Sequence, residues 1–503
     1  MRSWEDMRLS EVMAGTGARG ALADDPDIVR VTGDSREVVA GTLFCALPGA
    51  RVDGHAFARE AVARGAVAVV AERPVDASPT VTLLAPSSRR AMALAAANLL
   101  GRPADALRLA GVTGTNGKTT VAYLLEACLQ AAGVPTGVVG TVTHRFPGTL
   151  RPASHTPPES TELQALLAEM RDAGTRTVVL EVSSHALAQE RVAGCTFAVA
   201  GFTNLTRDHL DYHGDLEGYF AAKRRLFTEH LAPDGVAVVN ARDPWGARLA
   251  DQLGPGKQVW RYGTRAEDAL RPEGLESSLT GVRATLLTPR GPLPLASPLV
   301  GAHNVENLLC AAGMALALGV APDAVARGLA GSPGAPGRLE RIAGPGFDLF
   351  VDDAHTDDAL GRALQALRAL GPCRLITVFG CGGDRDRGKR PLMGEAAGRG
   401  SDLAVVTSDN PRSEPPGAIL AEIVPGLERA GRRALGAPSA IAGEAGYVVE
   451  PDRRAAIELA VACARPGDVI LVAGKGHEDY QLVAGERRHF DDREEARRAL
   501  GRA

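Results

Sequence analysis

Lysine is scarce in this 503-residue chain. Only Lys118, Lys223, Lys257, Lys389 and Lys475 occur among 56 basic residues, so the other 51 are arginine. A compositional drift toward Arg explains the imbalance wherever the side chain is merely a solvated cation. A lysine that persists under such drift marks a position where a guanidinium does not substitute for an ammonium. The few lysines are therefore candidate functional residues.

Cysteine and long apolar runs are scarce as well. The seven cysteines are scattered and form no CxxC pair, which indicates neither a disulfide framework nor a zinc site and suits a reducing compartment. The longest apolar run, residues 308–322, is shorter than the ~20 residues of a membrane helix. The opening MRSWEDMRLS lacks the apolar core of a signal peptide. We expect a cytoplasmic protein without membrane insertion.

An excess of positive charge is also missing. The 56 Lys and Arg face 60 Asp and Glu, and a net charge of −4 argues against nucleic-acid binding. With 23% charged and 45% hydrophobic residues, the composition is that of a globular protein, and the length predicts about three domains. Gly/Pro-rich segments at 101–104 and 331–337 divide the chain. The predicted domains are residues 1–104, 105–334 and 335–503.

The second and third domains alternate β-branched runs with Ala/Leu-rich helical stretches, which predicts an α/β fold with parallel sheets. The expected strands are residues 107–113, 177–181, 197–203, 236–240, 348–351, 375–379, 403–407 and 469–473. After the last four come DDAHTDD, GCGGDRDRGK, SDNPRSE and GKGHEDYQ. Because the carboxyl ends of parallel strands form a ligand crevice, we expect these loops to converge on one polar site. Four unrelated solvated loops are the alternative.

The segment ALRLAGVTGTNGKTTVAYLLEACL predicts a strand, a glycine-rich loop and a helix. Gly114, Gly117, Lys118 and Thr119 follow a P-loop pattern. In that pattern backbone N–H groups hold phosphate oxygens, Lys neutralises charge and the hydroxyl binds magnesium. A strict Walker A motif would have its first glycine at position 112, where this chain has Val112. A nucleoside triphosphate site is predicted, and a plain glycine-rich turn is the alternative.

Carboxylate and imidazole groups follow two neighbouring predicted strands. Glu181 begins EVSSHAL, and FTNLTRDHLDYHG starts near the end of the next strand. Side chains of this kind beside a phosphate loop suit magnesium and its water and substrate ligands. Taken one at a time, His185, His209 and His213 are more often structural residues than ligands.

Taken together, GTNGKTT, EVSSHAL and FTNLTRDHLDYHG resemble the Mur ligases, ATP-dependent amino-acid ligases of peptidoglycan precursor synthesis. The resemblance continues through DSREV, AAKRRLF, GAHNVEN, PGRLE, AHT, DNPR and GKGHE, in order along nearly the whole chain. It implies an amino-terminal domain for the UDP end of the substrate. It also implies a central P-loop-type ATPase domain with a parallel sheet, and a Rossmann-like carboxy-terminal domain that binds the amino acid. The implied protein is a cytoplasmic monomer of cell-wall biogenesis.

Site residues follow from the resemblance position by position. ATP contacts are implied at Gly114, Thr115, Asn116, Gly117, Lys118, Thr119, Thr120, Asn304, Arg338, Asp352 and His355. Contacts to the UDP-muramoyl dipeptide are implied at Ser35, Thr156, Ser184, Gln189 and Arg191. The catalytic positions are Lys118, Glu181, His209 and Lys223. Magnesium is assigned to Thr119, Glu181, His209 and Lys223, the last carbamylated by CO2. Without the resemblance, Lys223 would be interpreted as a solvated helix residue.

The DNPR loop is the form seen in family members that add meso-diaminopimelate. The implied contacts to that amino acid are Arg385, Asp409, Asn410, Arg412, Gly474 and Glu478. Diaminopimelate carries a carboxylate and an ammonium at its far end, where lysine carries only the ammonium. Arg385 and Arg412 can clamp the carboxylate and Glu478 the ammonium. A solvated turn arginine is the alternative for Arg412.

Two departures from the family pattern stand beside the nucleotide residues. Asp353 replaces an aromatic residue and Asp357 replaces a proline, which adds negative charge near the expected ATP phosphates. This charge is unfavourable unless the side chains point outward or meet a cation. Likewise, His155 replaces the usual first threonine of a pair before Thr156. The alternatives kept open are use of lysine or another diamino acid, a catalytically silent nucleotide-binding regulator, and a small-molecule kinase.

Overall fold

The structure is a computed structural model that describes residues 7–20, 24–49, 52–153 and 155–501. The chain forms two compact units. The first reaches to Pro272 and includes Leu286–Leu293 and Glu306–Leu329. The second comprises Glu273–Thr285, Pro294–Val305 and the chain from Ala330 onward. Each unit is described by itself.

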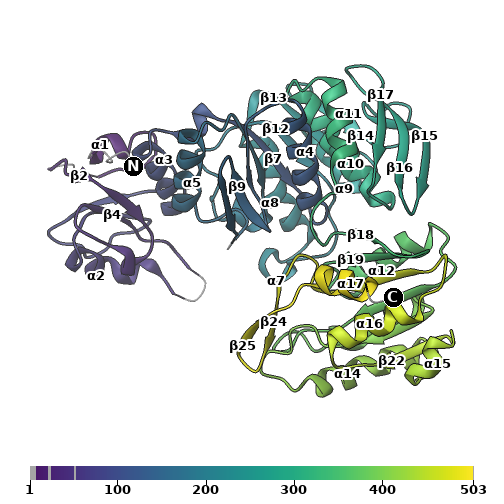
Figure 1. The fold of residues 1–503 in the computed structure, drawn as a ribbon. Helices are drawn as coiled ribbons and strands as arrows, with labels where there is room; N and C mark the ends of the chain where they lie inside the picture. Colours follow the sequence, from purple (N-terminus) through teal and green to yellow (C-terminus); the bar gives the residue numbers. More distant parts are fainter. Residues whose placement is uncertain (1–6, 21–23, 50–51, 154, 502–503) are drawn as a thin grey trace. The chain divides into compact units, whose positions relative to one another are not determined.

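An eight-stranded sheet in the order β10-β9-β8-β11-β7-β12-β13-β14 forms the centre of the first unit (Figure 1). The strands from β8 to β14 in this order are parallel, and β9 and β10 form an antiparallel edge. The bounds are β7 (Arg108–Thr113), β8 (Thr136–Val139), β9 (Thr143–Phe146), β10 (Thr149–Pro152), β11 (Thr177–Glu181), β12 (Phe197–Phe202), β13 (Leu231–Asn240) and β14 (Gln258–Tyr262). The four strands predicted in this part of the chain are confirmed to within a few residues.

Helices cross between these strands and bury regular apolar stripes. In α5 (Ser160–Asp172), Leu163, Leu166, Leu167 and Met170 recur at helical spacing and are buried in the core of the unit. The other helices are α4 (Lys118–Ala131), α6 (Ser184–Ala188), α7 (Leu210–His213), α8 (Leu216–Thr228), α9 (Pro244–Gln252), α10 (Ala302–Ala317) and α11 (Pro322–Gly331). At the start of α8, the Asp215 carboxylate accepts a hydrogen bond from the Gly218 amide at 2.8 Å.

A smaller parallel sheet, β3-β4-β5-β6, precedes the central sheet along the chain. Its strands are β3 (Arg30–Thr32), β4 (Thr42–Cys45), β5 (Ala66–Ala71) and β6 (Val81–Leu84), and a short pair, β1 (Met7–Arg8) and β2 (Asp27–Ile28), lies before it. Its helical segments are α1 (Leu9–Val12), η1 (Ser35–Glu37), η2 (Gly54–Phe57), α2 (Ala58–Ala63), α3 (Ser88–Leu99) and η3 (Pro103–Ala106). Contacts between α3 and α5 join this part to the rest of the first unit.

The second unit contains a six-stranded sheet in the order β18-β19-β23-β20-β21-β22, parallel except at β18. The bounds are β18 (Glu340–Ala343), β19 (Asp348–Asp352), β20 (Leu375–Phe379), β21 (Leu403–Val406), β22 (Gly446–Val449) and β23 (Val469–Ala473). Leu375 and Phe379 of β20 join one hydrophobic core, while Ile376 and Val378 join another. Both faces of the sheet are therefore covered, which explains the continuous apolar runs of its strands.

Helices α12 to α17 complete this Rossmann-like arrangement. They are α12 (Asp357–Arg368), α13 (Lys389–Gly400), α14 (Pro416–Arg429), α15 (Ala437–Ile441), α16 (Arg453–Cys463) and α17 (Asp492–Leu500). A hairpin of β24 (Tyr480–Val483) and β25 (Glu486–His489) lies outside the main sheet, and β15 (Arg271–Ser278), β16 (Gly281–Leu287) and β17 (Leu293–Ser297) form a separate sheet. Among the described residues, no helix combines the length and apolar character needed to cross a membrane.

A completely buried ion pair lies beneath the carboxyl ends of β21 and β23. Arg453, the first residue of α16, donates from Nε and Nη2 to the carboxylate of Asp492, both at 2.7 Å, and neither side chain is exposed. Its remaining donors reach the carbonyl oxygens of Ser408 (3.2 Å) and Ala473 (2.9 Å). The bidentate geometry and the carbonyl acceptors compensate much of the cost of removing the two charges from water.

We predict that Arg453→Met lowers the stability of the second unit by roughly 3–5 kcal/mol, because it leaves Asp492 as a buried uncompensated charge. Arg433→Met is the matched control, since it breaks a pair with Glu444 whose side chains are 69% and 40% exposed. The control should cost less than about 1 kcal/mol. Native-state hydrogen exchange of the β21 and β23 amides measures both, and equal protection in the two variants would contradict the role of the buried pair.

Candidate functional site

The predicted phosphate loop lies between β7 and α4, at the carboxyl end of a central strand. Gly114 and Gly117 both have positive φ, at 148° and 89°. A Cβ at Gly114 would lie 1.9 Å from Thr203 Oγ1, and one at Gly117 would lie 2.3 Å from Asn307 Oδ1. Glycine is therefore required at both positions by conformation and by space. The amino end of α4 follows at Lys118, as an anion site at a helix terminus needs.

The segment after β12 holds the phosphate loop in place. The Asn116 amide donates to Asn204 Oδ1 at 3.0 Å, and the Asn116 carbonyl accepts from Thr203 Oγ1 at 2.6 Å. Thr115 Oγ1 accepts from the Thr206 amide at 3.0 Å. The sequence segments GTNGKTT and FTNLT are thus joined by hydrogen bonds. Thr120, the last of the predicted ATP contacts here, is buried in the first turn of α4.

Two lysines point at one carbonyl oxygen of this loop. Lys118 Nζ donates to the carbonyls of Gly114 and Thr115, both at 2.9 Å, and Lys223 Nζ donates to the Gly114 carbonyl at 2.8 Å. Lys223 is 1% exposed, so its interpretation as a solvated helix residue is wrong. Burial, reinforced by the charge of Lys118, holds the pKa of Lys223 well below its usual value.

Glu181 ends β11 beside the phosphate loop and is held by neutral donors. Thr119 Oγ1 donates to its carboxylate at 2.8 Å, and Thr141 donates from its amide (2.8 Å) and its hydroxyl (3.0 Å). The carboxylate is buried, and it forms no ion pair within the part of the chain that the structure describes. A buried carboxylate beside a hydroxyl, without a cation of the protein, fits a divalent ion with oxygen ligands.

The other predicted metal ligand, His209, is more open. It has a φ of 51°, its side chain is 46% exposed, and its Nδ1 lies 3.4 Å from a carboxylate oxygen of Asp208. No group of three or more His, Cys, Asp or Glu suited to a metal occurs within residues 7–20, 24–49, 52–153 and 155–501. Oxygen ligands from elsewhere, such as phosphates, would have to complete a magnesium site at Thr119 and Glu181.

A cluster of aromatic and imidazole rings surrounds Lys223. His185 contacts the rings of His209 and His213, with centroids 4.9 and 5.3 Å apart, and His213 contacts Tyr219 at 5.2 Å. Lys223 Nζ lies 4.5 Å from the centroid of the Tyr219 ring. Burial, together with His185, Lys223 and His209, lowers the pKa of His213 to about 4. The cluster is therefore uncharged at His213 near neutral pH.

Most of the predicted substrate contacts of the first unit adjoin this cluster. Ser184 Oγ is 2.9 Å from His213 Nε2, and Gln189 Nε2 is 3.3 Å from the Tyr212 hydroxyl. Arg191 donates to Gln189 Oε1 at 2.7 Å and to the Pro157 carbonyl at 3.0 Å, which brings the segment after Thr156 to the same place. Ser35 begins η1 beside the smaller sheet, where its hydroxyl is 3.5 Å from Glu60.

The remaining predicted ATP contacts belong to the second unit. Asp352 ends β19 and accepts from the amides of Leu339 (2.7 Å) and Ala354 (2.9 Å), and burial raises its pKa to about 6. Asn304 is buried in α10 and donates to the Val300 carbonyl at 2.8 Å. His355 is exposed, and its Nδ1 lies 2.7 Å from the Asp353 carbonyl.

The negative charges of Asp353 and Asp357, the two acidic residues that depart from the family pattern, are both stabilised by their surroundings in the structure. Asp353 forms an ion pair with Arg338 at 2.7 Å, so the added charge meets a cation. Asp357 is the first residue of α12, where a negative charge is favoured by the helix dipole, and Thr356 caps the same helix. The charge that argued for a silent regulator is thus neutralised locally.

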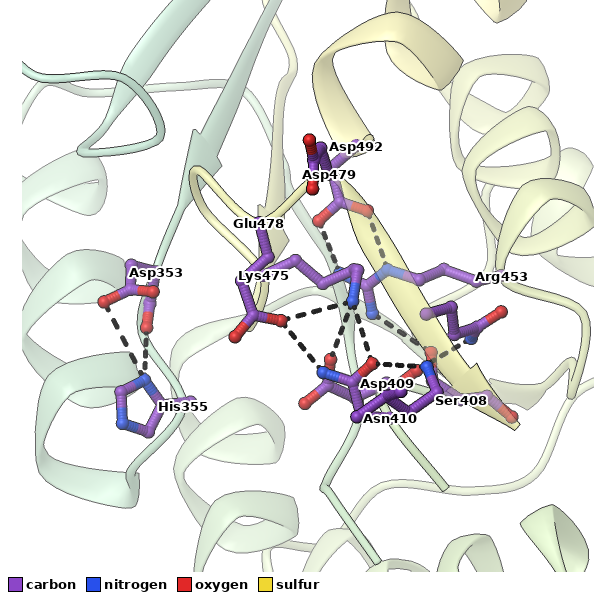
Figure 2. Close-up of polar contacts among 12 residues, drawn as sticks. Asp353, His355, Ser408, Asp409, Asn410, Arg453, Lys475, Glu478, Asp479 and Asp492 are labelled. Atoms are coloured by element: carbon purple, nitrogen blue, oxygen red, sulfur yellow. Dashed lines mark hydrogen bonds and ion pairs between the residues drawn. The ribbon is translucent and has the colours of Figure 1, made fainter. Parts of the chain in front are cut away.

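Polar loops of the second unit meet at the carboxyl ends of their strands, and Figure 2 shows residues of the loops after β19, β21 and β23. The loop after β20 joins them through Gly383, whose amide donates to the Asn410 carbonyl at 2.9 Å. Lys475 Nζ lies 3.3 Å from Asn410 Oδ1, 3.4 Å from Glu478 Oε2 and 3.7 Å from Asp409 Oδ1. Asn410 Nδ2 donates to Glu478 Oε2 at 2.9 Å. Lys389, from the loop after β20, donates to the His355 carbonyl at 2.9 Å. The alternative of four unrelated solvated loops is wrong.

Arg412 is anchored through its backbone and its side chain. Its φ is 52°, its amide donates to the Leu482 carbonyl at 2.9 Å, and its carbonyl accepts from the Ala484 amide at 2.7 Å. Its Nη1 donates to the Gly383 carbonyl at 2.6 Å, so the solvated-turn alternative is wrong. Arg385 on the neighbouring loop is exposed. Gly474 has a φ of 120°, and a Cβ there would lie 3.8 Å from both Arg453 and Asp409.

Several residues that shape the two sites escaped the sequence-based prediction. Thr141 makes two of the three hydrogen bonds to Glu181, and Arg453 and Asp492 form the floor beneath Asp409. Nothing in their sequence context singles them out. For Lys223 a signal exists, because it lies on the buried stripe of α8 between Tyr219 and Leu226. Lys257 donates to the carbonyls of Leu231 and Ala232 and has a structural role.

Three family models match the chain in sequence. The Mur ligase family catalytic domain matches residues 27–110, the Mur ligase middle domain residues 112–315, and the Mur ligase glutamate ligase domain residues 337–476. Among curated relatives, the UDP-N-acetylmuramoyl-L-alanyl-D-glutamate–2,6-diaminopimelate ligase of Geobacter metallireducens is 49% identical over 98% of this chain and 97% of its own. The protein of the same name from Gloeobacter violaceus is 49% identical over 99% and 98%.

A solved structure of a UDP-N-acetylmuramoyl-L-alanyl-D-glutamate–2,6-diaminopimelate ligase is similar over the whole length. It is 34% identical, covers 99% of each chain and superimposes with a TM-score of 0.74. The similarity therefore includes the central sheet with its phosphate loop as well as the six-stranded sheet with its polar loops.

We predict that the imidazole of His213 titrates near pH 4, chiefly because its burial disfavours the protonated form. His489, whose pKa is raised by the Glu494 carboxylate, should titrate above 6.5 and serves as the internal control in an NMR titration. An unfolded chain takes up this proton near pH 6.5 and the folded chain does not. Stability from His213 is therefore present above pH 6.5 and lost as the pH falls toward 4. A stability profile unchanged by His213→Gln would contradict the assignment.

Proposed function

The chain belongs to the Mur ligase family, and we propose that it joins diaminopimelate to the D-glutamate of UDP-N-acetylmuramoyl-L-alanyl-D-glutamate in an ATP-dependent reaction of peptidoglycan synthesis. Its similarity to ligases of that name covers 98% of the chain and supports the reaction class. The observation that carries the choice of amino acid is the polar cluster of the second unit, where Arg412, Asp409 and Glu478 converge.

The chemistry of the reaction requires two steps. The γ-phosphoryl group of ATP is transferred to the γ-carboxylate of D-glutamate, which gives an acyl phosphate and ADP. The neutral amine of diaminopimelate then attacks the acyl carbon, phosphate leaves, and the amine loses a proton to give the amide. A carboxylate has no leaving group of its own and repels a nucleophile, so the first step makes the second possible.

The phosphate loop is suited to the first step. Amides at the start of α4 and the side chain of Lys118 bind and orient the triphosphate, which supports transfer by holding the reactants in line. Thr119 and Glu181 would hold a magnesium ion, with His209 and a modified Lys223 near it. Such an ion would supply neutralising positive charge for the phosphates. Asn304, Arg338, Asp352 and His355 are also proposed as ATP contacts.

Lys223 is proposed to carry a carbamate. Reaction of an amine with CO2 forms an N–C bond and releases a proton, and only the neutral amine has the electron pair for it. The low pKa of Lys223 supports this because burial and Lys118 favour the neutral form. The product is a carboxylate next to Lys118, whose ammonium would then face an opposite charge. A guanidinium offers no such route, which explains the persistence of lysine here.

The amino-acid site is proposed to bind the far end of meso-diaminopimelate, with Arg412 and Arg385 on its carboxylate and Asp409 or Glu478 on its ammonium. Asp409 supports this role because its Oδ1 is buried and accepts no hydrogen bond in the described structure. Such an oxygen gains a donor when an ammonium binds. Asn410 is largely occupied by protein contacts and orients Glu478, and Gly474 leaves the space that a side chain would fill.

The same proposal assigns a separate binding role to each of the three predicted domains. Residues 1–104, with Ser35, would hold the UDP end of the substrate, residues 105–334 would bind ATP, and residues 335–503 would bind the amino acid. Thr156, Ser184, Gln189 and Arg191 are assigned to the muramoyl dipeptide. We propose a monomer in the cytoplasm, where its nucleotide substrates are found.

Assay of the purified protein with ATP, the UDP-muramoyl dipeptide and either meso-diaminopimelate or L-lysine tests the proposal. We expect phosphate release and amide formation with diaminopimelate, and discrimination against lysine on the order of a hundredfold or more, because Arg412 would lack its partner. Hydroxylamine should trap the acyl phosphate. Equal use of lysine would contradict the role of Arg412, a stable phosphorylated product would indicate a kinase, and absence of substrate-dependent phosphate release would indicate a silent regulator.

We predict that Lys223→Ala lowers kcat by on the order of a hundredfold or more, because the carboxylate-like group that positions the reacting phosphate is lost. High concentrations of acetate or chloride should restore part of the activity by occupying the vacated anionic position. Lys257→Ala, which removes a lysine that only binds backbone carbonyls, is the matched control and should retain wild-type kcat. Full activity of unrescued Lys223→Ala would disprove the role.

A further inference from the structure

Lys475 is a completely buried charged group of the proposed amino-acid site. Its side chain is 0% exposed, although it follows the carboxyl end of β23 by only two residues. Its contacts are Asn410 at 3.3 Å, Glu478 at 3.4 Å and Asp409 at 3.7 Å, and the ring of Tyr480 lies 5.6 Å away. The ammonium thus connects the loop after β21 to the loop after β23 (Figure 2).

Within the part of the chain that the structure describes, Lys475 is the only cation within 4 Å of the Asp409 and Glu478 carboxylates. The charge of Arg453 beneath them is already paired with Asp492 at 2.7 Å. Removing the charge of Lys475 would leave these two carboxylates without a close cation. In a buried site such an imbalance acts strongly on any charged group that binds.

We propose that Lys475 is a specificity-determining positioning residue, which balances the carboxylates of the amino-acid site so that it selects a ligand end bearing both an ammonium and a carboxylate. This inference rests on the proposed function. The positive charge of Lys475 beside Asp409 and Glu478 weakens the attraction of these carboxylates for an ammonium alone. The carboxylate of a dipolar end, which Arg412 and Arg385 would bind, offsets that loss. Lys475 therefore favours diaminopimelate over free L-lysine as the substrate, without contacting either amino acid.

The shape of the site explains why this position keeps lysine in an arginine-rich chain. The ammonium sits between Asn410 Oδ1, which also accepts from the Leu482 amide at 2.9 Å, and the carboxylates of Asp409 and Glu478. A compact ammonium donates to Asn410 Oδ1 and Glu478 and lies within ion-pair distance of Asp409. A planar guanidinium of greater volume would displace Asn410 and with it the hairpin β24–β25. The same argument accounts for the complete burial of Lys475.

The test compares Lys475→Met with the matched control Lys257→Met in the full chain. For each, kcat and KM are measured with meso-diaminopimelate and with L-lysine. We expect Lys475→Met to lower the ratio of kcat/KM for diaminopimelate over lysine by about tenfold or more, chiefly through the KM for diaminopimelate. The KM values for ATP and the UDP substrate should stay within about twofold in both variants, and Lys257→Met should keep the wild-type ratio. Equal losses with both amino acids would mean a purely structural role and overturn the inference.

Asn410→Asp provides a second variant in case Lys475→Met does not fold. It keeps the lysine and the size of residue 410 but adds one negative charge at the same point, so the ratio should again shift toward lysine. A ratio that is unchanged in this variant would also overturn the inference. A wild-type protein that uses neither amino acid would instead refute the proposed function. A wild-type preference for diaminopimelate that persists in both variants would leave the proposed function intact while Lys475 loses its role.

Discussion

At the carboxyl edge of the six-stranded sheet, the buried guanidinium of Arg453 holds two strand ends together. It donates to the carbonyls of Ser408 and Ala473 and pairs with Asp492, so it satisfies two backbone acceptors that leave the sheet without ladder partners. Asp409 directly follows the first of these carbonyls and Gly474 the second. This one buried side chain therefore helps to fix the positions of Asp409 and Gly474 in the amino-acid site.

In the phosphate loop, backbone carbonyl oxygens are likewise bonded by buried or half-buried basic side chains, but these are lysines instead of arginine. Lys118 and Lys223 share the Gly114 carbonyl as an acceptor. Burial, reinforced by the charge of Lys118, lowers the pKa of Lys223 and favours its neutral form. A permanently charged guanidinium cannot lose its proton in this way. The two sites thus use the two basic residue types for opposite reasons.

Much of the fold was predictable because it rests on local patterns. The buried parallel strands β11, β20 and β23 were predicted from β-branched runs in the sequence, with the bounds that the structure shows. The glycine-rich segment before Lys118 likewise predicted the phosphate loop. The convergence of the polar loops follows from the rule that parallel strands end on one side. The resemblance in motif order supplied the family, which the matching domain models confirm.

The parts that escaped prediction depend on contacts between residues far apart in the sequence. Arg453 and Asp492 lie 39 residues apart, and Thr141 and Glu181 lie 40 apart. No periodicity or spacing reveals such pairs. The compensation of Asp353 by Arg338 is of the same kind, since the sequence showed the added charge but not its partner. The burial of Lys223 was missed for a different reason. A lysine is usually solvated, and this expectation was given more weight than its position among the apolar residues of α8.

The scarcity and burial of lysine give this protein an unusual chemical surface. None of the five lysine side chains is exposed, while arginines such as Arg36, Arg59 and Arg399 carry the outward positive charge. Acylating reagents that seek side-chain amines therefore meet guanidinium groups, which they do not modify under mild conditions. Lys223 and Lys475 are buried, one at each of the two proposed sites, so covalent probes aimed at these two amines would have to enter those sites to react. Lys257 lies apart from both sites and is half-buried.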